Sequence, residues 1–159
     1  MFAPRTIMQL LSILAFALYA TIASAQAPSY GPSITLDSAK KVAAAAAAEA
    51  KKNNWNMAIA IVDTGGYLVY YERLDDTQSG SVQIALDKAK TAAMFRRPSR
   101  VFEEGVAKGR VALLGLTGAI PITGGVPIMS GGKVVGGIGV SGATGDQDEQ
   151  CAKAGAAAM

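Results

Sequence analysis

The first half of the chain alternates between a long alanine-rich segment and two short β-rich segments. Leu36–Lys52 contains six consecutive alanines, and Thr35 before it is a good N-terminal cap, so this range is predicted to be a helix. Met57–Val62 is a continuous apolar run, and Tyr67–Tyr71 is rich in aromatic and branched residues. Because Gly65-Gly66 lies between these two runs, they are predicted to form a β-hairpin.

The middle of the chain returns to a helical pattern. Val82–Phe95 is predicted to be a helix, which Pro98 ends, and Ser99 is expected to cap a short helix over Arg100–Lys108. The residues that place small or apolar side chains on or near one face of the longer helix are Ile84, Ala85, Ala89, Ala92 and Ala93.

The last third is rich in glycine, and its apolar runs are short. Gly131-Gly132 is predicted to be a hairpin turn. A closing helix is expected from Asp146, because Asp146 and Glu149 have the spacing of a capping box. The strands predicted here are Ala119–Ile122, Val126–Met129 and Val134–Ser141.

The order of these elements predicts the fold class. Several links between strands are too short for crossover helices, so the sheet is expected to be antiparallel, with helices covering it in two or three layers. This is an α/β fold of the α+β kind. A chain of 159 residues without an internal repeat suits one domain, which we assign to residues 34–159.

The N-terminus has the features of a secretory signal. One basic residue, Arg5, precedes an apolar run over Ile7–Leu18, and Ala23-Ser24-Ala25 is a cleavage-site pattern. The alternative is an uncleaved anchor, but the run is shorter than the roughly 20 residues that span a bilayer. We therefore expect residues 1–25 to be a signal peptide, residues 26–33 to be a flexible leader, and the protein to be periplasmic or extracellular.

Charge and residue types exclude several classes of function. The 15 basic and 12 acidic residues are scattered, so nucleic acid is not an expected partner. The absence of histidine excludes Ser-His-Asp and Cys-His catalysis, the usual zinc sites and a proximal-histidine haem. Cys151, the only cysteine, cannot form an intrachain disulfide; we expect it to be buried in a helix, with pairing between chains as the alternative.

Two glycine-rich motifs each have a structural and a functional interpretation. Gly137–Gly142 matches G-x-G-x-x-G, but too little chain follows for a dinucleotide-binding unit, so close backbone approach of a helix or a flat ligand is favoured. Gly124 and Gly125 precede Pro127, which is typical of a turn before an edge strand. Their backbone N–H groups could equally line a pocket, and the sequence leaves both interpretations open.

Charged clusters have similar alternatives. Arg96, Arg97 and Arg100 surround a predicted helix end, where they either complement the helix dipole in solvent or bind carboxylates of a ligand. The acidic groups at Asp75-Asp76 and Asp146–Glu149 lack the ordered spacing of a calcium loop, so no metal site is predicted.

Five motifs occur together in the order and spacing of the GlcG/HbpS family, which the chain resembles from Ile34 to Ala158. The family is similar to the C-terminal domain of the cobalamin adenosyltransferases associated with propanediol use. The resemblance implies a profilin-like fold with a five-stranded antiparallel sheet, a homo-oligomer, and haem binding or haem degradation. The motifs are Ile61–Gly66, Ala85 with Lys88–Ala92, Gly124–Ile128, Val135–Ala143 and Gln147–Gly155.

The resemblance also implies how haem, the candidate cofactor, would be held. A threonine in the K-A-x-T-A segment is the iron ligand suggested by an exported haem-binding member, and it corresponds to Thr91; the alternative is that Thr91 bonds its own helix. Arg96 and Arg97 would meet the propionates, since guanidinium groups bind carboxylates. Gly124, Gly125 and Pro127 would line the pocket. The other candidate donors are Tyr70, Tyr71, Met57, Met129, Cys151 and nearby lysines.

Three hypotheses of function follow. The leading one is an exported, homo-oligomeric protein that binds a small ligand, haem or another flat tetrapyrrole, in a surface cleft. The second is an enzyme acting on a small organic acid or on haem, with Lys88, Asp63, Asp148 or a tyrosine transferring protons. The third is a non-catalytic accessory subunit of a sensory or catabolic system.

Overall fold

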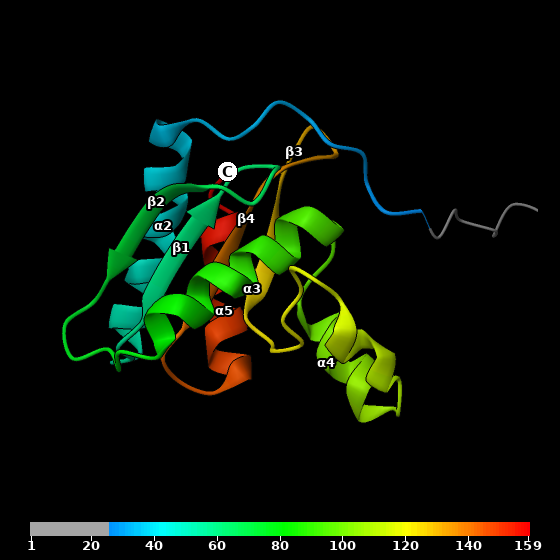
Figure 1. Cartoon of the computed structure of the whole chain (residues 1–159). Coiled ribbons are helices and arrows are strands. Elements are labelled where there is room, and N and C mark those ends of the chain that lie inside the picture. Colours follow the sequence, from blue (N-terminus) through cyan, green and yellow to red (C-terminus); the bar gives the residue numbers. More distant parts are fainter. Residues whose placement is uncertain (1–25) are drawn as a thin grey trace, which may run out of the picture.

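A four-stranded antiparallel sheet separates two layers of helices in the computed structural model, which describes residues 26–159 (Figure 1). The predicted signal peptide, residues 1–25, lies outside the described residues. Within 26–159, no helix has the length and apolar character needed to cross a membrane. The elements are α2 (Leu36–Lys52), β1 (Ala58–Val62), β2 (Leu68–Arg73), α3 (Ser81–Phe95), α4 (Arg100–Ala107), the 3-10 helix η1 (Val111–Gly115), β3 (Gly125–Ser130), β4 (Lys133–Ser141) and α5 (Gly145–Ala156).

Two hairpins build the sheet in the order β2-β1-β4-β3. In the β1–β2 turn, the Asp63 carboxylate accepts hydrogen bonds from the backbone N–H groups of Gly65 (2.8 Å) and Tyr67 (2.9 Å). In the β3–β4 turn, Gly131 and Gly132 both have positive φ, which confirms the predicted glycine turn. β1 and β4 are the central strands, and β3 is an edge strand, where a proline is tolerated.

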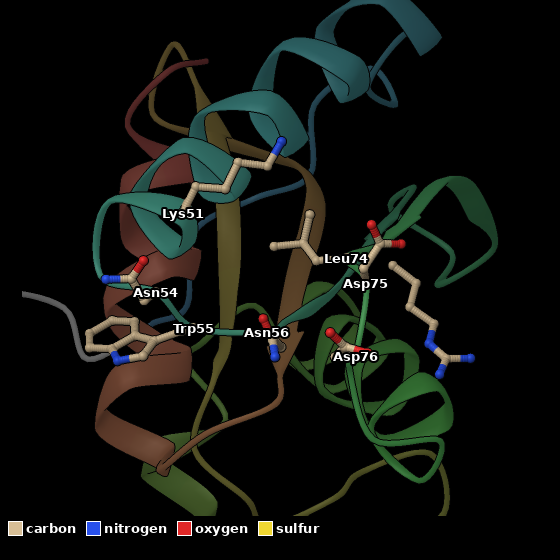
Figure 2. A pocket seen from close by; sticks show the side chains of 8 residues that line it. Lys51, Asn54, Trp55, Asn56, Leu74, Asp75 and Asp76 are labelled. Carbon is tan, nitrogen blue, oxygen red and sulfur yellow. The ribbon is translucent and has the colours of Figure 1, made fainter.

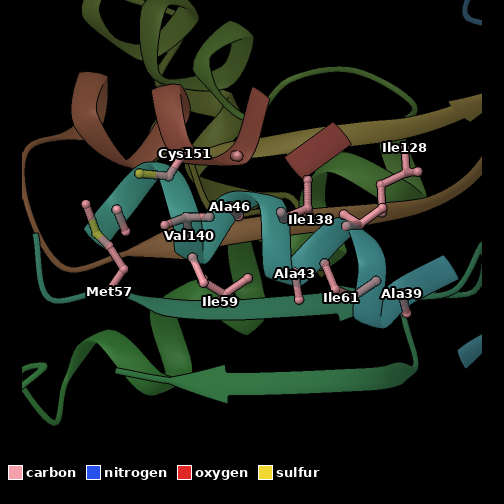
Figure 3. Close-up of a cluster of buried hydrophobic side chains, with 14 of the residues drawn as sticks. Ala39, Ala43, Ala46, Met57, Ile59, Ile61, Ile128, Ile138, Val140 and Cys151 are labelled. Atoms are coloured by element: carbon pink, nitrogen blue, oxygen red, sulfur yellow. The ribbon is translucent and has the colours of Figure 1, made fainter. Parts of the chain in front are cut away.

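One face of the sheet is covered by α2 and α5 around the main hydrophobic core (Figure 3). Small side chains of the alanine run allow close packing: a Cβ added at Gly155 of α5 would lie 2.9 Å from the Val42 carbonyl oxygen of α2. The Thr35 hydroxyl caps α2 by accepting from the Ser38 N–H, as predicted. The cap of α5 differs from the prediction, because Thr144 and Gln147, rather than Asp146 and Glu149, form the capping box.

The other face is covered by α3, which lies against the glycines of β4. A Cβ at Gly139 would lie 2.0 Å from the Ala85 carbonyl oxygen, and a Cβ at Gly137 would lie 2.4 Å from that of Ala89. The G-x-G-x-x-G motif therefore provides close approach between a strand and a helix, which is the helix-packing interpretation. Helices on both faces give three layers, α2 and α5, the sheet, and α3.

The expected fifth strand is absent from the described sheet, so the five-stranded prediction is wrong. Residues 119–122, predicted to be a strand, have no strand partner, because side chains bond their backbone groups. The Ile120 N–H donates to the Thr91 hydroxyl (2.8 Å), and the Ile122 carbonyl accepts from the Ser99 hydroxyl (2.7 Å). The Ser99 hydroxyl also accepts from the Gly125 N–H, so it joins neighbouring loop segments and does not cap α4.

The segment predicted to be a flexible leader contacts the sheet. The Gly31 N–H donates to the Val134 carbonyl (2.8 Å), and the Val134 N–H donates to the Ser29 carbonyl (2.9 Å). Tyr30 and Val134 form an isolated parallel bridge. Residues 29–31 therefore extend the sheet beside the start of β4, beyond the end of β1.

Candidate functional site

A groove of about 400 Å³ lies beside the outward face of α3, lined by Asp87, Lys90, Gly118, Ala119 and Ile120. Its volume falls in the range of ligand clefts, roughly 300 to 1,000 Å³. One wall comes from the helix and carries the two charged side chains, and the other comes from the loop that was predicted to be a strand. We call it the α3 groove.

Thr91 lies beneath the wall of this groove and is completely buried. Its hydroxyl donates to the Asp87 carbonyl one turn earlier (2.8 Å) and accepts from the Ile120 N–H (2.8 Å). The first bond is the local helix bond that is the alternative role for this residue. The second bond holds the 118–120 loop against α3, so Thr91 shapes the groove from within and does not face its opening.

Met94 lies on the same outward face, one turn after Lys90, and 43% of its surface is exposed. A Cβ at Gly118, in the groove wall, would lie 3.5 Å from the Met94 Cε, and a Cβ at Gly66 would lie 3.0 Å from its Sδ. The sequence motifs did not identify Met94. The signal that could have found it is an apolar, sulfur-bearing residue on the otherwise polar stripe of Gln83, Asp87 and Lys90.

Arg96 and Arg97 follow the end of α3 and border a second hollow of about 280 Å³ with Ala27, Pro28 and Val101. Arg96 has a left-handed conformation with φ of 55°. Its guanidinium group donates to the Pro28 carbonyl (3.0 Å) and stacks 5.1 Å above the Tyr30 ring, so it holds the 28–30 segment. Arg97 is exposed, and its Nε donates to the nearby Phe95 carbonyl (3.1 Å).

The Gly124-Gly125 pair lies against α3 and away from the groove opening. A Cβ at Gly125 would lie 2.2 Å from the Lys88 carbonyl oxygen, and Gly124 has φ of 127°. Both glycines are buried, and the Gly125 N–H donates to Ser99 (2.8 Å). Pro127 pairs with Gly137 on the edge strand. These positions support the turn and edge-strand interpretation of the motif.

A buried ion pair connects α3 to α5. The Lys88 Nζ lies 2.7 Å from the Asp148 Oδ2, and both side chains are at most 3% exposed. The Lys88 ammonium also donates to the Val140 carbonyl (3.1 Å), and the Ala143 N–H donates to the other Asp148 oxygen (3.0 Å). Burial raises the pKa of Asp148, while Lys88 and the backbone N–H groups act in the opposite direction. This pair therefore holds elements together and does not face a groove.

Two of the other candidate iron donors are enclosed. Met57 and Cys151 are fully buried in the main core, as Figure 3 shows, and burial raises the pKa of the Cys151 thiol to about 12. A thiol with so high a pKa stays protonated and is a poor metal ligand at neutral pH. Tyr70 and Tyr71 are half-buried on β2, and Met129 is exposed on β3.

A third hollow, of about 430 Å³, lies at the far end of the sheet, after α2 and β2. Figure 2 shows Asn54 and Trp55 on one side of it and Leu74 and Asp75 on the other. None of the residues predicted to bind a ligand lies there. We take the α3 groove as the candidate site because Thr91, the residue predicted to bind iron, holds the 118–120 loop that forms its wall.

Two relatives match part of the chain. Protein GlcG of Escherichia coli strain K12 is 43% identical over 89 residues, which are 52% of this chain and 66% of GlcG. An uncharacterized 15.0 kDa protein of Citrobacter freundii, from the dhaT-dhaS intergenic region, is 37% identical over 83 residues, which are 52% of this chain and 58% of that protein. The chain thus spans slightly less than two thirds of the relatives that it matches.

Solved structures match more completely. A double mutant of HbpS from Streptomyces reticuli is 35% identical with a TM-score of 0.75, covering 82% of this chain and 90% of HbpS. A complex of PduOC with haem has a TM-score of 0.71, covering 80% of this chain and 95% of PduOC, but at 23% identity it shows the fold alone. A sequence model described as "Haem degrading protein HbpS-like" matches residues 34–157. This confirms the resemblance that the five motifs indicated, and the chain belongs to the HbpS-like family.

Proposed function

We propose that this protein binds haem or a related tetrapyrrole in the α3 groove. The description of its family names haem, and PduOC, which shares the fold, has been solved with haem. The observation that carries the proposal is the groove itself, where the Lys90 amine, the Asp87 carboxylate and the apolar Ala119 and Ile120 surround one opening. A flat, largely apolar ligand with carboxylates needs both kinds of surface.

The residues present fit such a ligand. Ala119 and Ile120 would contact a porphyrin face, and burial of that face supplies most of the affinity. Lys90 is the cation in the groove that would meet a propionate, whereas Arg97 lines the separate hollow beyond the end of α3. Bound haem would supply an iron whose reactivity depends on its axial ligand and on the surrounding hydrogen bonds.

A haemin titration of the chain from Gln26 onward, followed at the Soret band, tests the proposal. We expect a saturable, shifted band in the wild type. Lys90→Glu reverses a charge in the groove, so it should weaken binding about fivefold, from roughly 1 kcal/mol for an exposed charge pair. Lys51→Glu reverses a charge in the distant hollow and serves as the matched control, with unchanged affinity. An unsaturable rise, identical in all three proteins, would refute haem binding at this groove.

We also propose that the protein is exported to the periplasm or the medium after cleavage behind Ala25. The order of one basic residue, an apolar run and an A-x-A pattern supports this. Cys151, the only cysteine, is buried, which is compatible with an oxidising compartment because its thiol is not exposed to oxidants. Mass spectrometry of the protein from culture fractions tests the proposal: a mature N-terminus at Gln26 is expected, and an intact Met1 would contradict it.

Self-assembly is a further proposal. Several large apolar side chains are exposed on α4 and η1, namely Val101 (46%), Val111 (66%) and Leu114 (62%). None of the residues of η1 is buried within the described chain. Large apolar side chains that stay exposed on one segment favour an association site, so we propose that this segment packs against another copy of the chain.

A further inference from the structure

We propose that the hollow at the far end of the sheet binds a neutral, polyhydroxylated ligand, a sugar, stacked on Trp55. We call it the Trp55 hollow (Figure 2). Its volume of about 430 Å³ falls in the range of ligand clefts. The proposal goes beyond haem binding, because the Trp55 hollow shares no lining residue with the α3 groove.

Trp55 gives the hollow a flat apolar surface. The residue is half-buried: its side chain packs against the main core and also lines the hollow. Its backbone N–H donates to the Ala50 carbonyl (3.0 Å), which holds it close to the end of α2. An indole has an apolar face and a single N–H donor. A pyranose ring has an apolar face of C–H groups that stacks on such a surface, while its hydroxyls reach polar partners around the rim.

The polar side chains around the indole are available for such hydroxyls. Asn54, Asn56 and Asp75 carry amide or carboxylate groups that have no hydrogen bond or ion pair with any other residue in 26–159. The same is true of the Asp76 carboxylate and the Lys51 amine. An amide donates and accepts, a carboxylate accepts and an ammonium donates. Because a hydroxyl also donates and accepts, this mixture of groups can bind it in either role.

The hollow beside α4, about 350 Å³ in volume, differs in this respect. Its polar side chains are bound to other residues of the chain. Arg100 forms ion pairs with Asp146 and Glu149, and Glu103 accepts from the backbone N–H of Thr123 (2.6 Å) and from its hydroxyl. A ligand there would have to displace these contacts, whereas a ligand in the Trp55 hollow would replace only water.

The charges that line the Trp55 hollow balance one another. Lys51 and Arg73 supply two cations, and Asp75 and Asp76 supply two carboxylates. The Arg73 guanidinium already donates to the Thr77 carbonyl (2.7 Å). An anion or a cation would be attracted by one pair of charges and repelled by the other, whereas a neutral ligand avoids this conflict. The balance therefore favours a neutral polar ligand over a phosphate, a carboxylate or an amine.

Backbone geometry holds both walls of the hollow in place. On one wall, the Leu74 N–H donates to the Met57 carbonyl (2.9 Å), and the Thr77 hydroxyl donates to the Leu74 carbonyl (2.7 Å). Asn54 and Asp76 lie on opposite walls and have positive φ, 57° and 58°, a conformation that few residues other than glycine adopt. A site whose walls are held before binding needs little ordering, which favours affinity.

The fluorescence of Trp55 tests the proposal directly, because the chain contains no other tryptophan. The probes, added to the chain from Gln26 onward, are glucose, galactose, N-acetylglucosamine and cellotriose. Choline, glycine betaine and inorganic phosphate serve as cationic, zwitterionic and anionic comparisons. We expect a saturable change in indole emission with at least one of the saccharides, and no change with the charged probes at the same concentrations.

Three variants, followed by calorimetry, locate the binding. Trp55→Ala removes the stacking surface and should abolish it. Asp75→Ala removes an exposed carboxylate without a partner, so it should fold, which circular dichroism checks. It should weaken binding about tenfold, as loss of a hydrogen bond to a charged group does. Tyr67→Ala removes an aromatic side chain that is 76% exposed at the other end of β2, and it should keep the wild-type affinity.

The outcomes separate this proposal from haem binding. No saturable change with any saccharide, or saccharide affinity that is equal in the wild type and Asp75→Ala, overturns the sugar site. Binding of choline, glycine betaine or phosphate without any saccharide overturns it as well, because the ligand is then charged. Haemin affinity should be the same in Asp75→Ala and the wild type, so a failure of the haem proposal leaves the sugar site standing, and the reverse holds too.

Discussion

The buried ion pair between Lys88 and Asp148 leads to a prediction about stability. Lys88→Met replaces the ammonium with an apolar side chain of similar length and leaves the Asp148 carboxylate without its charged partner. Asp148 is only 3% exposed, so water cannot replace Lys88. Removing one partner of a buried pair costs about 3 to 5 kcal/mol, because the remaining charge is uncompensated.

That cost is large compared with the total stability of a domain, about 5 to 15 kcal/mol. A matched control is Lys153→Met. The Lys153 Nζ also lies 2.7 Å from a carboxylate oxygen, that of Glu149, but the lysine side chain is 62% exposed. An exposed pair contributes about 0 to 1 kcal/mol. Two ion pairs with equal N···O distances should therefore differ severalfold in energy, because Lys153 is exposed and Glu149 also keeps Arg100 as a partner at 3.0 Å.

The pH dependence provides a second test of the same effect. Burial raises the pKa of Asp148 even with Lys88 present, and without Lys88 the pKa should rise further. An ionised acid whose pKa is raised in the folded state destabilises that state. This loss of folding stability becomes smaller as the pH falls toward the unfolded-state pKa of roughly 4. The difference in free energy of unfolding between Lys88→Met and the wild type should therefore shrink by about 1 kcal/mol or more when the pH falls from 7.5 to 5.

Urea unfolding at both pH values measures these differences. A second variant, Lys88→Met with Asp148→Leu, removes both charges and should recover most of the loss, as apolar replacements of buried pairs often do. Equal losses of stability in Lys88→Met and Lys153→Met at pH 7.5, or a deficit in Lys88→Met that grows as the pH falls, would refute the role assigned to burial.

Three further predictions concern packing, thiol chemistry and assembly. Gly139→Ala should lower the free energy of unfolding, measured by thermal unfolding, by about 3 kcal/mol or more, because its Cβ would lie 2.0 Å from the Ala85 carbonyl oxygen. Gly80→Ala, where an added Cβ meets open space, should leave the free energy unchanged, and equal effects of the two substitutions would contradict this. Cys151 should not react with a disulfide reagent at pH 8 until urea unfolds the protein, since burial raises its pKa to about 12; rapid native labelling would contradict this. Leu114→Glu should lower the mass found by light scattering, and a monomeric wild type would refute assembly through η1.

Local signals were sufficient for the helices and hairpins. The bounds of α2 match those predicted from the alanine run and the Thr35 cap. Glycine pairs correctly placed the two turns of the sheet. Each of these features depends on residues close together in the sequence, where helix propensity, capping and positive φ decide the conformation.

The prediction of a fifth strand was wrong because the conformation of this segment depends on residues that are distant in the sequence. Residues 119–122 are a short apolar run that resembles a strand, but a strand also needs backbone partners. The Thr91 and Ser99 side chains bond these backbone groups instead, from positions about 20 to 30 residues earlier. Local apolar patterning cannot reveal that a serine and a threonine in other elements will substitute for a neighbouring strand.

The candidate site shows a second limit of local sequence motifs. Thr91 matched a family motif, and its chemistry as an oxygen donor was plausible, but a motif does not state which way a side chain points. On α3 the small apolar residues face the sheet, and Thr91 and Lys88 lie on that buried side with them. Met94 lies on the outward stripe with Lys90, four positions away, so its exposure follows from helical periodicity rather than from the motif.

The division of α3 into two sides connects these observations. On the inward side, Lys88 bonds Asp148 and Thr91 bonds Ile120, so the polar groups with acid–base or ligand chemistry serve to join α3 to α5 and to the 118–120 loop. On the outward side, Asp87 and Lys90 border a groove that this same loop forms. Since the inward contacts place the loop that makes the outward wall, Thr91→Val should weaken haem binding through the shape of the groove, which a haemin titration measures against the wild type. Unchanged haem affinity in a folded Thr91→Val variant would contradict the role of the Thr91–Ile120 hydrogen bond in shaping the groove.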